Sequence, residues 1–159
     1  MSKAKKVAVM MGSRSDMEVM NNCTEMLKGF GIEADVKVLS AHRTPKQTIA
    51  FAANAQRRGY MAIIAAAGGA AHLAGVVAAH TTLPVIGVPI DTKALAGIDS
   101  LFSTVQMPSG VPVACMAIGK AGAVNAAIFA AEILALNDKT LKAKLDRYKK
   151  TLAESILKK

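Results

Sequence analysis

The sequence predicts a single α/β domain in which helices cover both faces of a central parallel sheet, giving a three-layer αβα sandwich. Apolar runs rich in valine and isoleucine alternate with segments of helical spacing, which is the pattern of βαβ units. None of these runs alternates cleanly between apolar and polar residues, as expected for strands buried on both faces. The chain has 159 residues, of which 52% are hydrophobic and 19% charged, so it can bury one sizeable core.

Five apolar runs are predicted to form the strands, and in chain order they are Lys6–Met11, Ile32–Leu39, Tyr60–Ala67, Leu83–Ile90 and Val111–Ile118. Helices are expected between them, beginning near Asp16, Pro45, His72 and Lys120, with a shorter helix at 97–105 and a last one from Asn137.

Glycine and proline mark the expected ends of the helices. Gly29 and Gly31 bracket the end of the first helix, and Gly59 ends the second. Thr44 offers an N-cap, and Pro45 follows it at the first helical position, where a proline is tolerated.

The charge is concentrated at the two ends of the chain. Twenty Lys and Arg against eleven Asp and Glu give a net charge of +9, of which residues 1–6 carry +3 and residues 137–159 carry +5. We therefore expect one domain over 1–159, with a core at 6–136 and a basic C-terminal helix at 137–159. Nucleic-acid binding is not expected, because basic residues are not interleaved with aromatic ones across the folded region.

No segment has the length of a signal-peptide core or a membrane span. Residues 7–11 are too few for the former, and residues 62–71 have about half the length that a bilayer requires. A cytoplasmic protein without a membrane partner is expected. Cys23 and Cys115 are predicted to be free, buried thiols.

Three loops at the carboxyl ends of predicted strands are candidates for a ligand site. The first, residues 12–16, offers Gly12, two hydroxyls and backbone N–H groups before a helix, which suits a phosphate. It has neither a Walker A nor a dinucleotide-binding spacing. Asp16 has two compatible interpretations, as the N-cap of the helix or as a carboxylate that accepts hydrogen bonds from ligand hydroxyls such as those of ribose.

The second loop, residues 40–45, is the densest polar cluster of the chain. His42 can exchange protons near neutral pH, and Arg43 can bind phosphate through its fork of donors. The alternative is that His42 only packs or caps and that Arg43 is solvated.

The third loop, residues 68–75, carries almost no side chain except His72. Such a loop lets a flat ligand approach the backbone, although a tight helix entry has the same composition. On residues alone, His72 and His80 are more often structural than functional. No metal site is expected, because the histidines have no carboxylate or thiol partner at ligand spacing.

The residues alone therefore predict a phosphorylated small molecule bound by Ser13, Asp16 and Arg43, with His42 as proton donor or acceptor. A non-catalytic module that binds a nucleotide-like metabolite remains open at this point.

At the three loops the sequence closely resembles the 5-(carboxyamino)imidazole ribonucleotide mutases, the bacterial class I of the phosphoribosylaminoimidazole carboxylase catalytic-subunit family. The segments that carry the resemblance are Met11–Asp16, Ser40–Pro45 and Gly68–Leu73, followed by Gly87–Pro89, Asp99–Leu101, Val105–Pro108 and Ala117–Gly122. The resemblance runs from about residue 7 to residue 136.

The resemblance implies a flavodoxin-like domain and an isomerase of de novo purine biosynthesis that works without ATP, biotin or metal. Its reaction moves a carboxylate from the exocyclic nitrogen of the substrate to the imidazole ring, through decarboxylation and recarboxylation. His42 would protonate the departing nitrogen and later remove the proton from the ring carbon.

The resemblance also assigns the substrate contacts. Gly12, Ser13 and Ser15 would hold the 5′-phosphate with Arg43, while Asp16 would bind the ribose hydroxyls. The remaining residues expected to bind substrate are Ser40, Gly68, Gly69, Ala70 and His72, of which the third loop would cradle the base and the migrating carboxylate. Homo-octamers with shared sites, and functional coupling to a carboxyaminoimidazole ribonucleotide synthetase, are implied as partners.

The sequence departs from the family pattern at Met17, Ala66 and Ala74, where tryptophan, glycine and proline are usual. These departures are expected to change packing and loop stiffness without loss of chemistry. A related class that carboxylates aminoimidazole ribonucleotide directly with free carbon dioxide is the runner-up. The third loop favours the mutase.

Overall fold

The computed structural model describes residues 5–157 and contains one parallel sheet with the strand order β2-β1-β3-β4-β5. The strands are β1 (Lys6–Met11), β2 (Glu33–Val38), β3 (Tyr60–Gly68), β4 (Val85–Ile90) and β5 (Ala114–Cys115). This is the flavodoxin-like doubly wound order, which reverses direction between β1 and β3. The predicted fold class is confirmed.

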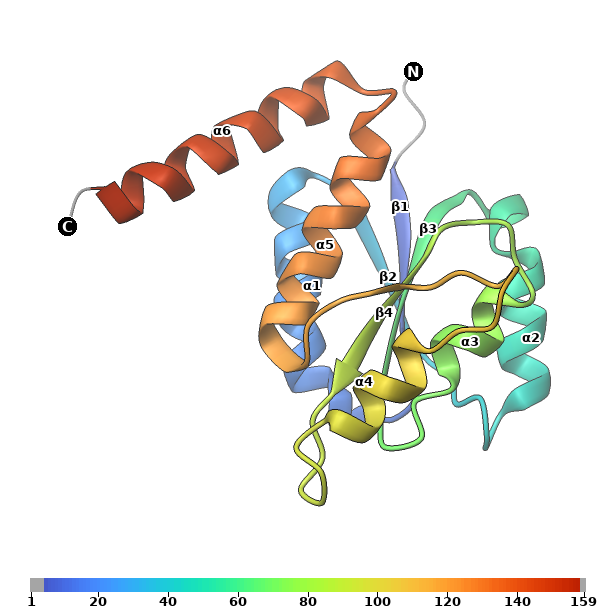
Figure 1. The fold of residues 1–159 in the computed structure, drawn as a ribbon. Coiled ribbons are helices and arrows are strands. Elements are labelled where there is room, and N and C mark those ends of the chain that lie inside the picture. Colours follow the sequence, from blue (N-terminus) through green and yellow to red (C-terminus); the bar gives the residue numbers. More distant parts are fainter. Residues whose placement is uncertain (1–4, 158–159) are drawn as a thin grey trace.

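Helices cover both faces of the sheet (Figure 1). One face packs against α1 (Met17–Phe30) and α5 (Gly119–Ala135), and the other against α2 (Pro45–Asn54) and α3 (Leu73–Ala78). Successive residues of β1 enter the two cores in turn: Val9 lies in the core beneath α1 and α5, and Met10 in the opposite core. Burial on both faces explains why β1, β3 and β4 read as unbroken apolar runs. The edge strand β2 is only partly buried and alternates apolar residues with Glu33, Asp35 and Lys37, which corrects the expectation that no strand alternates.

Two further helices lie outside these layers. The short α4 (Ile98–Val105) follows β4, and the long α6 (Lys139–Leu157) projects away from the body of the domain (Figure 1). Short 3₁₀ turns occupy Arg14–Asp16 and Gln56–Arg58.

The fifth strand is the main correction to the predicted elements. We expected a strand over Val111–Ile118, whereas only Ala114 and Cys115 pair, with Ile86 and Gly87 of β4. The strand lies at the edge of the sheet with a single neighbour, and Pro112 has no N–H to donate to a ladder.

The helix ends agree only in part with expectation. Gly29 in the last turn of α1 and Gly31 after it, at a φ of +78°, bracket the end of the helix as predicted. Gly59 does not end the second helix: α2 ends at Asn54, and Gly59 follows the 3₁₀ turn Gln56–Arg58. Thr44 stands at the N-cap of α2 without capping it, because its hydroxyl accepts from the N–H of Ser40 at 2.8 Å and donates to the Ser40 carbonyl.

Both thiols are free, as predicted, but only Cys23 is buried. Burial raises the pKa of the Cys23 thiol to about 12, whereas Cys115 is half-buried. Within residues 5–157, no helix combines the length and apolar character that a membrane crossing requires.

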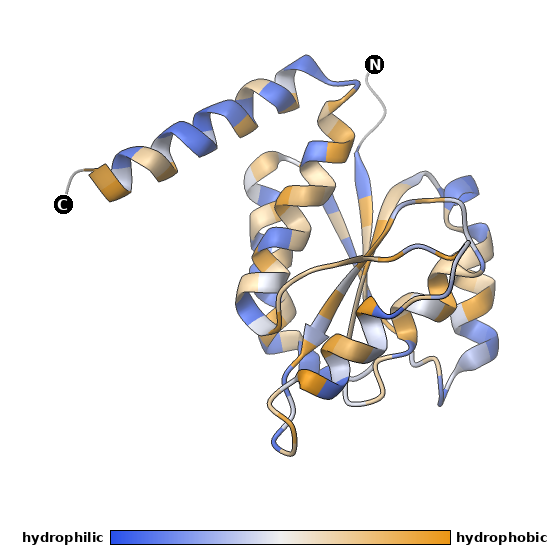
Figure 2. Ribbon diagram, viewed as in Figure 1, coloured by the Kyte–Doolittle hydropathy of each residue, from blue (hydrophilic) through white to orange (hydrophobic). Residues whose placement is uncertain are grey.

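The buried contacts of the basic C-terminal helix with its own chain lie in its first half, and the Nζ of Lys149 forms an ion pair with Glu132 of α5 at 2.8 Å. Leu141 and Leu145 are buried against the core, and the Nζ of Lys144 donates to the carbonyl of Phe30 at 2.9 Å. Beyond Tyr148, whose ring meets that of Phe30 edge-on, the helix is exposed. Its charged residues stand beside the exposed apolar side chains of Leu152, Ile156 and Leu157, and its last turn is hydrophobic (Figure 2).

A charge network ties β2 to the amino ends of β1 and β3. The carboxylate of Asp35 accepts from the Nζ of Lys37 at 2.7 Å, from the Nζ of Lys6 at 3.2 Å and from the hydroxyl of Tyr60. Partial burial raises the pKa of Asp35, but the hydrogen bonds from Lys37, Tyr60 and Lys6 outweigh burial and hold the pKa at about 2.

This network predicts acid sensitivity of the fold. Because the pKa of Asp35 is lower than its ordinary value of 3.8, the ionised carboxylate stabilises the fold above that value. The stabilisation is lost as the pH falls through about 4 to about 2. Denaturation midpoints measured from pH 7 to pH 2 should fall less steeply over this window in Asp35→Asn than in the parent protein.

Asp146→Asn is the matched control, because Asp146 forms only an exposed ion pair with Lys142 on α6. It should keep the parent protein's acid dependence. An unchanged acid dependence in Asp35→Asn would contradict the assignment.

Candidate active site

A cavity of about 500 Å³ lies at the carboxyl edge of the sheet, beside the reversal of strand order between β1 and β3. Its size and position are those of a small-molecule site in a doubly wound fold. Every site residue predicted from the sequence lines it, and these residues are Gly12, Ser13, Ser15, Asp16, Ser40, His42, Arg43, Gly68, Gly69, Ala70 and His72.

Sequence reasoning missed one wall of the cavity. Ile90, Asp91 and Thr92, at the end of β4, also line it. The rule that led to the first three loops would have found them, since they end a predicted strand that lies in the same parallel sheet.

The first loop is organised by a capping box. The Oγ of Ser13 accepts from the N–H of Ser15 at 3.3 Å, and the Oδ2 of Asp16 accepts from the N–H of Ser13 at 3.2 Å. Ser13 is therefore the capping residue, which corrects the interpretation of Asp16 as the N-cap. Asp16 precedes α1 but makes no side-chain cap bond to that helix.

Asp16 is a buried carboxylate in the cavity wall, with 7% of its surface exposed. Burial raises its pKa, and the hydrogen bonds from Ser15 and Ser13, with the charge of Arg43, lower it by less. Its Oδ1 also accepts from the hydroxyl of Ser15 at 3.1 Å. Local hydrogen bonds thus hold this acceptor in place at the cavity.

The second loop is tied to the first by Arg43. Its Nη2 donates to the carbonyl of Gly12 at 2.7 Å, and its Nε donates to the Oγ of Ser40 at 3.4 Å. No carboxylate among residues 5–157 lies within ion-pair distance of the guanidinium. Arg43 therefore presents an unpaired positive charge, with N–H donors to spare, at the cavity.

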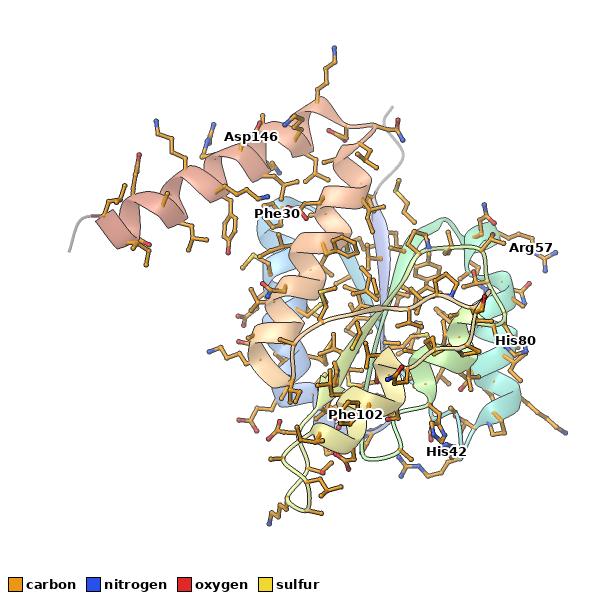
Figure 3. The ribbon with its side chains drawn as sticks, viewed as in Figure 1. Phe30, His42, Arg57, His80, Phe102 and Asp146 are labelled. Atoms are coloured by element: carbon orange, nitrogen blue, oxygen red, sulfur yellow. The ribbon has the colours of Figure 1, made fainter. Side chains whose placement is uncertain are left out.

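The second and third loops meet through two histidines. The Nε2 of His42 lies 2.9 Å from the Nδ1 of His72, with the ring planes at 90°. One ring must donate and the other accept, so the contact couples the tautomers of the two residues. His42 lies at the lower end of the molecule in this view, which is also the end where β4 finishes (Figures 1 and 3). The ring of His80 contacts the carbonyl of Val76 within its own segment, at 2.8 Å.

The third loop needs its glycines. Gly69 has a φ of +64°, and a Cβ at Gly68 would lie 3.2 Å from the Cγ2 of Thr92 and 3.3 Å from the carbonyl of Ile90. The two glycines thus let the backbone pass close to the end of β4. Among the described residues, no group of three or more His, Cys, Asp or Glu side chains is placed to hold a metal ion.

The departures from the family pattern fall in the packed interior. Ala66 and Ala74 are buried, and Met17 packs against the core beneath α1. None of the three lines the cavity.

Fold and cavity together define a small-molecule site of the doubly wound α/β class, with hydroxyls, an arginine and paired histidines around it. The sequence model of the family described as AIR carboxylase matches residues 6–155. The chain belongs to this family.

Curated relatives are similar over nearly the whole chain. A protein of Brucella melitensis named N5-carboxyaminoimidazole ribonucleotide mutase is 55% identical, over 94% of this chain and 93% of its own. An Escherichia coli K12 protein of the same name is 50% identical, over 96% of this chain and 90% of its own. The crystal structure of Treponema denticola PurE superposes with a TM-score of 0.86 at 29% identity, covering 97% of this chain and 95% of that one.

Proposed function

We propose that the protein is an isomerase of purine biosynthesis, formed by a single domain over 1–159. It converts 5-carboxyamino-1-(5-phosphoribosyl)imidazole to 5-amino-1-(5-phosphoribosyl)imidazole-4-carboxylate. The observation that carries the proposal is the cavity in which the three mutase-like loops converge around His42 and Arg43. Identity of about 50% to proteins named for this activity supports it.

In this proposal the first two loops bind the ribose phosphate. Gly12, Ser13 and Ser15 line the cavity at the start of a helical segment, where the helix dipole stabilises a phosphate and the two serine hydroxyls can donate to it. Arg43 supplies the positive charge from the second loop, beside Ser40. The fixed carboxylate of Asp16 accepts hydrogen bonds from the ribose hydroxyls.

His42 carries the proton chemistry. Protonated His42 gives its proton to the exocyclic nitrogen as the bond from nitrogen to the carboxylate carbon breaks, and the bonding electron pair stays on nitrogen. The ring carbon then attacks the released carbon dioxide and forms the new carbon–carbon bond. Neutral His42 takes the proton from that ring carbon, which restores the aromatic ring and returns His42 to its starting state.

The third loop holds the base and the carbon dioxide. Gly68, Gly69 and Ala70 present backbone groups without bulk, so the flat ring can approach closely. Carbon dioxide released in a site shielded from bulk water recombines with the ring before it escapes.

The proposed enzyme is a homo-oligomer, of the octameric kind that the family resemblance implies, located in the cytoplasm and functionally coupled to a carboxyaminoimidazole ribonucleotide synthetase. Support for self-association comes from α4, which is amphipathic in the reverse sense. Ser100 and Thr104 are buried, whereas Ile98, Phe102 and Val105 are about half exposed (Figures 2 and 3). A second copy that covers this apolar face would also shield the neighbouring cavity.

A carbon-13 NMR time course tests the reaction. With substrate labelled in its carbamate carboxylate and unlabelled bicarbonate in excess, the label should appear on the ring carboxylate. A ring product without label would indicate the direct carboxylase, and no protein-dependent product would leave only a binding module.

Substitutions at the two key side chains should separate chemistry from binding. His42→Asn should lower kcat at least about a hundredfold and still bind the nucleotide. Arg43→Ala should raise KM about tenfold and change kcat by less than about twofold, because it removes charge-assisted hydrogen bonds to the phosphate.

The measurement is steady-state kinetics with calorimetric binding of the nucleotide. His80→Asn is the control for His42→Asn, since His80 lies outside the cavity. Normal turnover by His42→Asn would refute its catalytic role.

Disruption of the α4 face should weaken assembly. Phe102→Glu places a charge at the centre of this face and should lower the mass measured by light scattering during gel filtration. Met61→Glu is the matched control, because it also replaces an exposed apolar side chain by a carboxylate, but near the amino end of β3. It should leave the mass unchanged. A monomeric parent protein, or an unchanged mass for Phe102→Glu, would contradict the proposed interface.

A further inference from the structure

The polar side of α4 is bonded to the end of β4 and to the residues that follow it. The buried Oγ of Ser100 lies 2.7 Å from the carbonyl of Ile90, the last residue of β4. The hydroxyl of Thr92 donates to the Oδ2 of Asp99 at 3.2 Å. The helix is thereby held against the segment that forms the fourth wall of the cavity.

Ser103, one turn after Asp99, extends this connection to the third loop. Its Oγ accepts from the N–H of Ala71 at 3.0 Å and lies 3.3 Å from the carbonyl of Gly69. The carbonyl of Asp99, 2.8 Å away, is the nearest acceptor for the hydroxyl's own proton. The bond to the loop is therefore chiefly the one that Ala71 donates.

This bond satisfies a buried backbone donor. Ala71 has 1% of its surface exposed, so its N–H has no ready access to water if the serine hydroxyl is removed. Loss of the acceptor favours a shift of the loop toward water. Gly69 and Ala70, directly before Ala71, line the cavity, and His72, directly after it, contacts His42.

We propose that Ser103 is a positioning residue for the reaction, which holds the loop from Gly68 to His72 at the distance that keeps the base and the released carbon dioxide together. The inference rests on the proposed function. Ser103 does not line the cavity and acts through the backbone of Ala71. Its removal should therefore affect retention of carbon dioxide more than phosphate binding, which belongs to the first two loops.

Three variants test the role. Ser103→Ala removes the acceptor, and Ser103→Thr restores a hydroxyl at the same position. Ser155→Ala is the matched control: Ser155 is another helical serine that bonds back to its own helix, at 2.7 Å from the carbonyl of Leu152, on the exposed half of α6. Thermal unfolding is measured for each, so that a general loss of folded protein is seen separately.

The main readout is kinetic. With the carbon-13 substrate and excess unlabelled bicarbonate, Ser103→Ala should lower kcat about tenfold or more, because small misplacements of a reacting centre have large effects on rate. KM should change by less than about twofold, and the fraction of product that keeps the label should fall. Ser103→Thr should recover both kcat and label retention, and Ser155→Ala should match the parent protein.

Deuterium exchange provides a readout without turnover. The peptide that spans residues 68–73 should exchange faster in Ser103→Ala than in the parent protein, while peptides of β1 remain unchanged. If the parent protein converts no substrate, the proposed function fails, and this exchange still decides whether Ser103 holds the loop.

Two results would overturn the inference. One is a Ser103→Ala protein with the parent kcat, label retention and exchange. The other is a loss of activity that follows only the loss of folded protein, with label retention unchanged and no recovery in Ser103→Thr.

Discussion

The parallel pairing of β1 with both β2 and β3 is the constraint on which the site depends. Met11 pairs with Val38 on one side and with Ala66 on the other, so β1, β2 and β3 all end at the same edge of the sheet. Two backbone bonds carry the pairing beyond the strands: Gly12 donates to Ala66, and Leu39 donates to the carbonyl of Met11. The first, second and third loops therefore start side by side, although they are far apart in the chain.

From that edge onward, polar contacts between loops replace apolar packing. Arg43 bonds to the carbonyl of Gly12, His42 meets His72, and Ser103 accepts from Ala71. Each contact joins two different loops or a loop and a helix. Because these contacts lie outside the apolar core, the geometry of the site and the stability of the fold depend on different residues.

The helix α4 connects the site with the surface of the molecule. Its buried side is polar, because hydroxyls at Ser100 and Ser103 bond to the ends of β4 and the third loop. Its solvent-facing side is apolar, and Phe102 on that side is 57% exposed. A second copy on this surface would press the helix against the loop that it holds. Self-association and catalysis are thus linked in the proposed enzyme by a single short helix.

The sequence by itself determined the layers of the fold and the three loops that line the cavity. Short unbroken apolar runs such as the one ending at Met11 favour strands buried on both faces of a sheet, and a parallel sheet gathers its loops at one edge. Only the tertiary structure decided the shortness of β5, the role of Asp16 beside Ser13, and the contact of His42 with His72. These features depend on the number of neighbours a strand has, on competition between nearby hydrogen-bond acceptors, and on the proximity of residues distant in sequence. Local periodicity and residue type do not predict these three features, because each arises from the packing of one element against another.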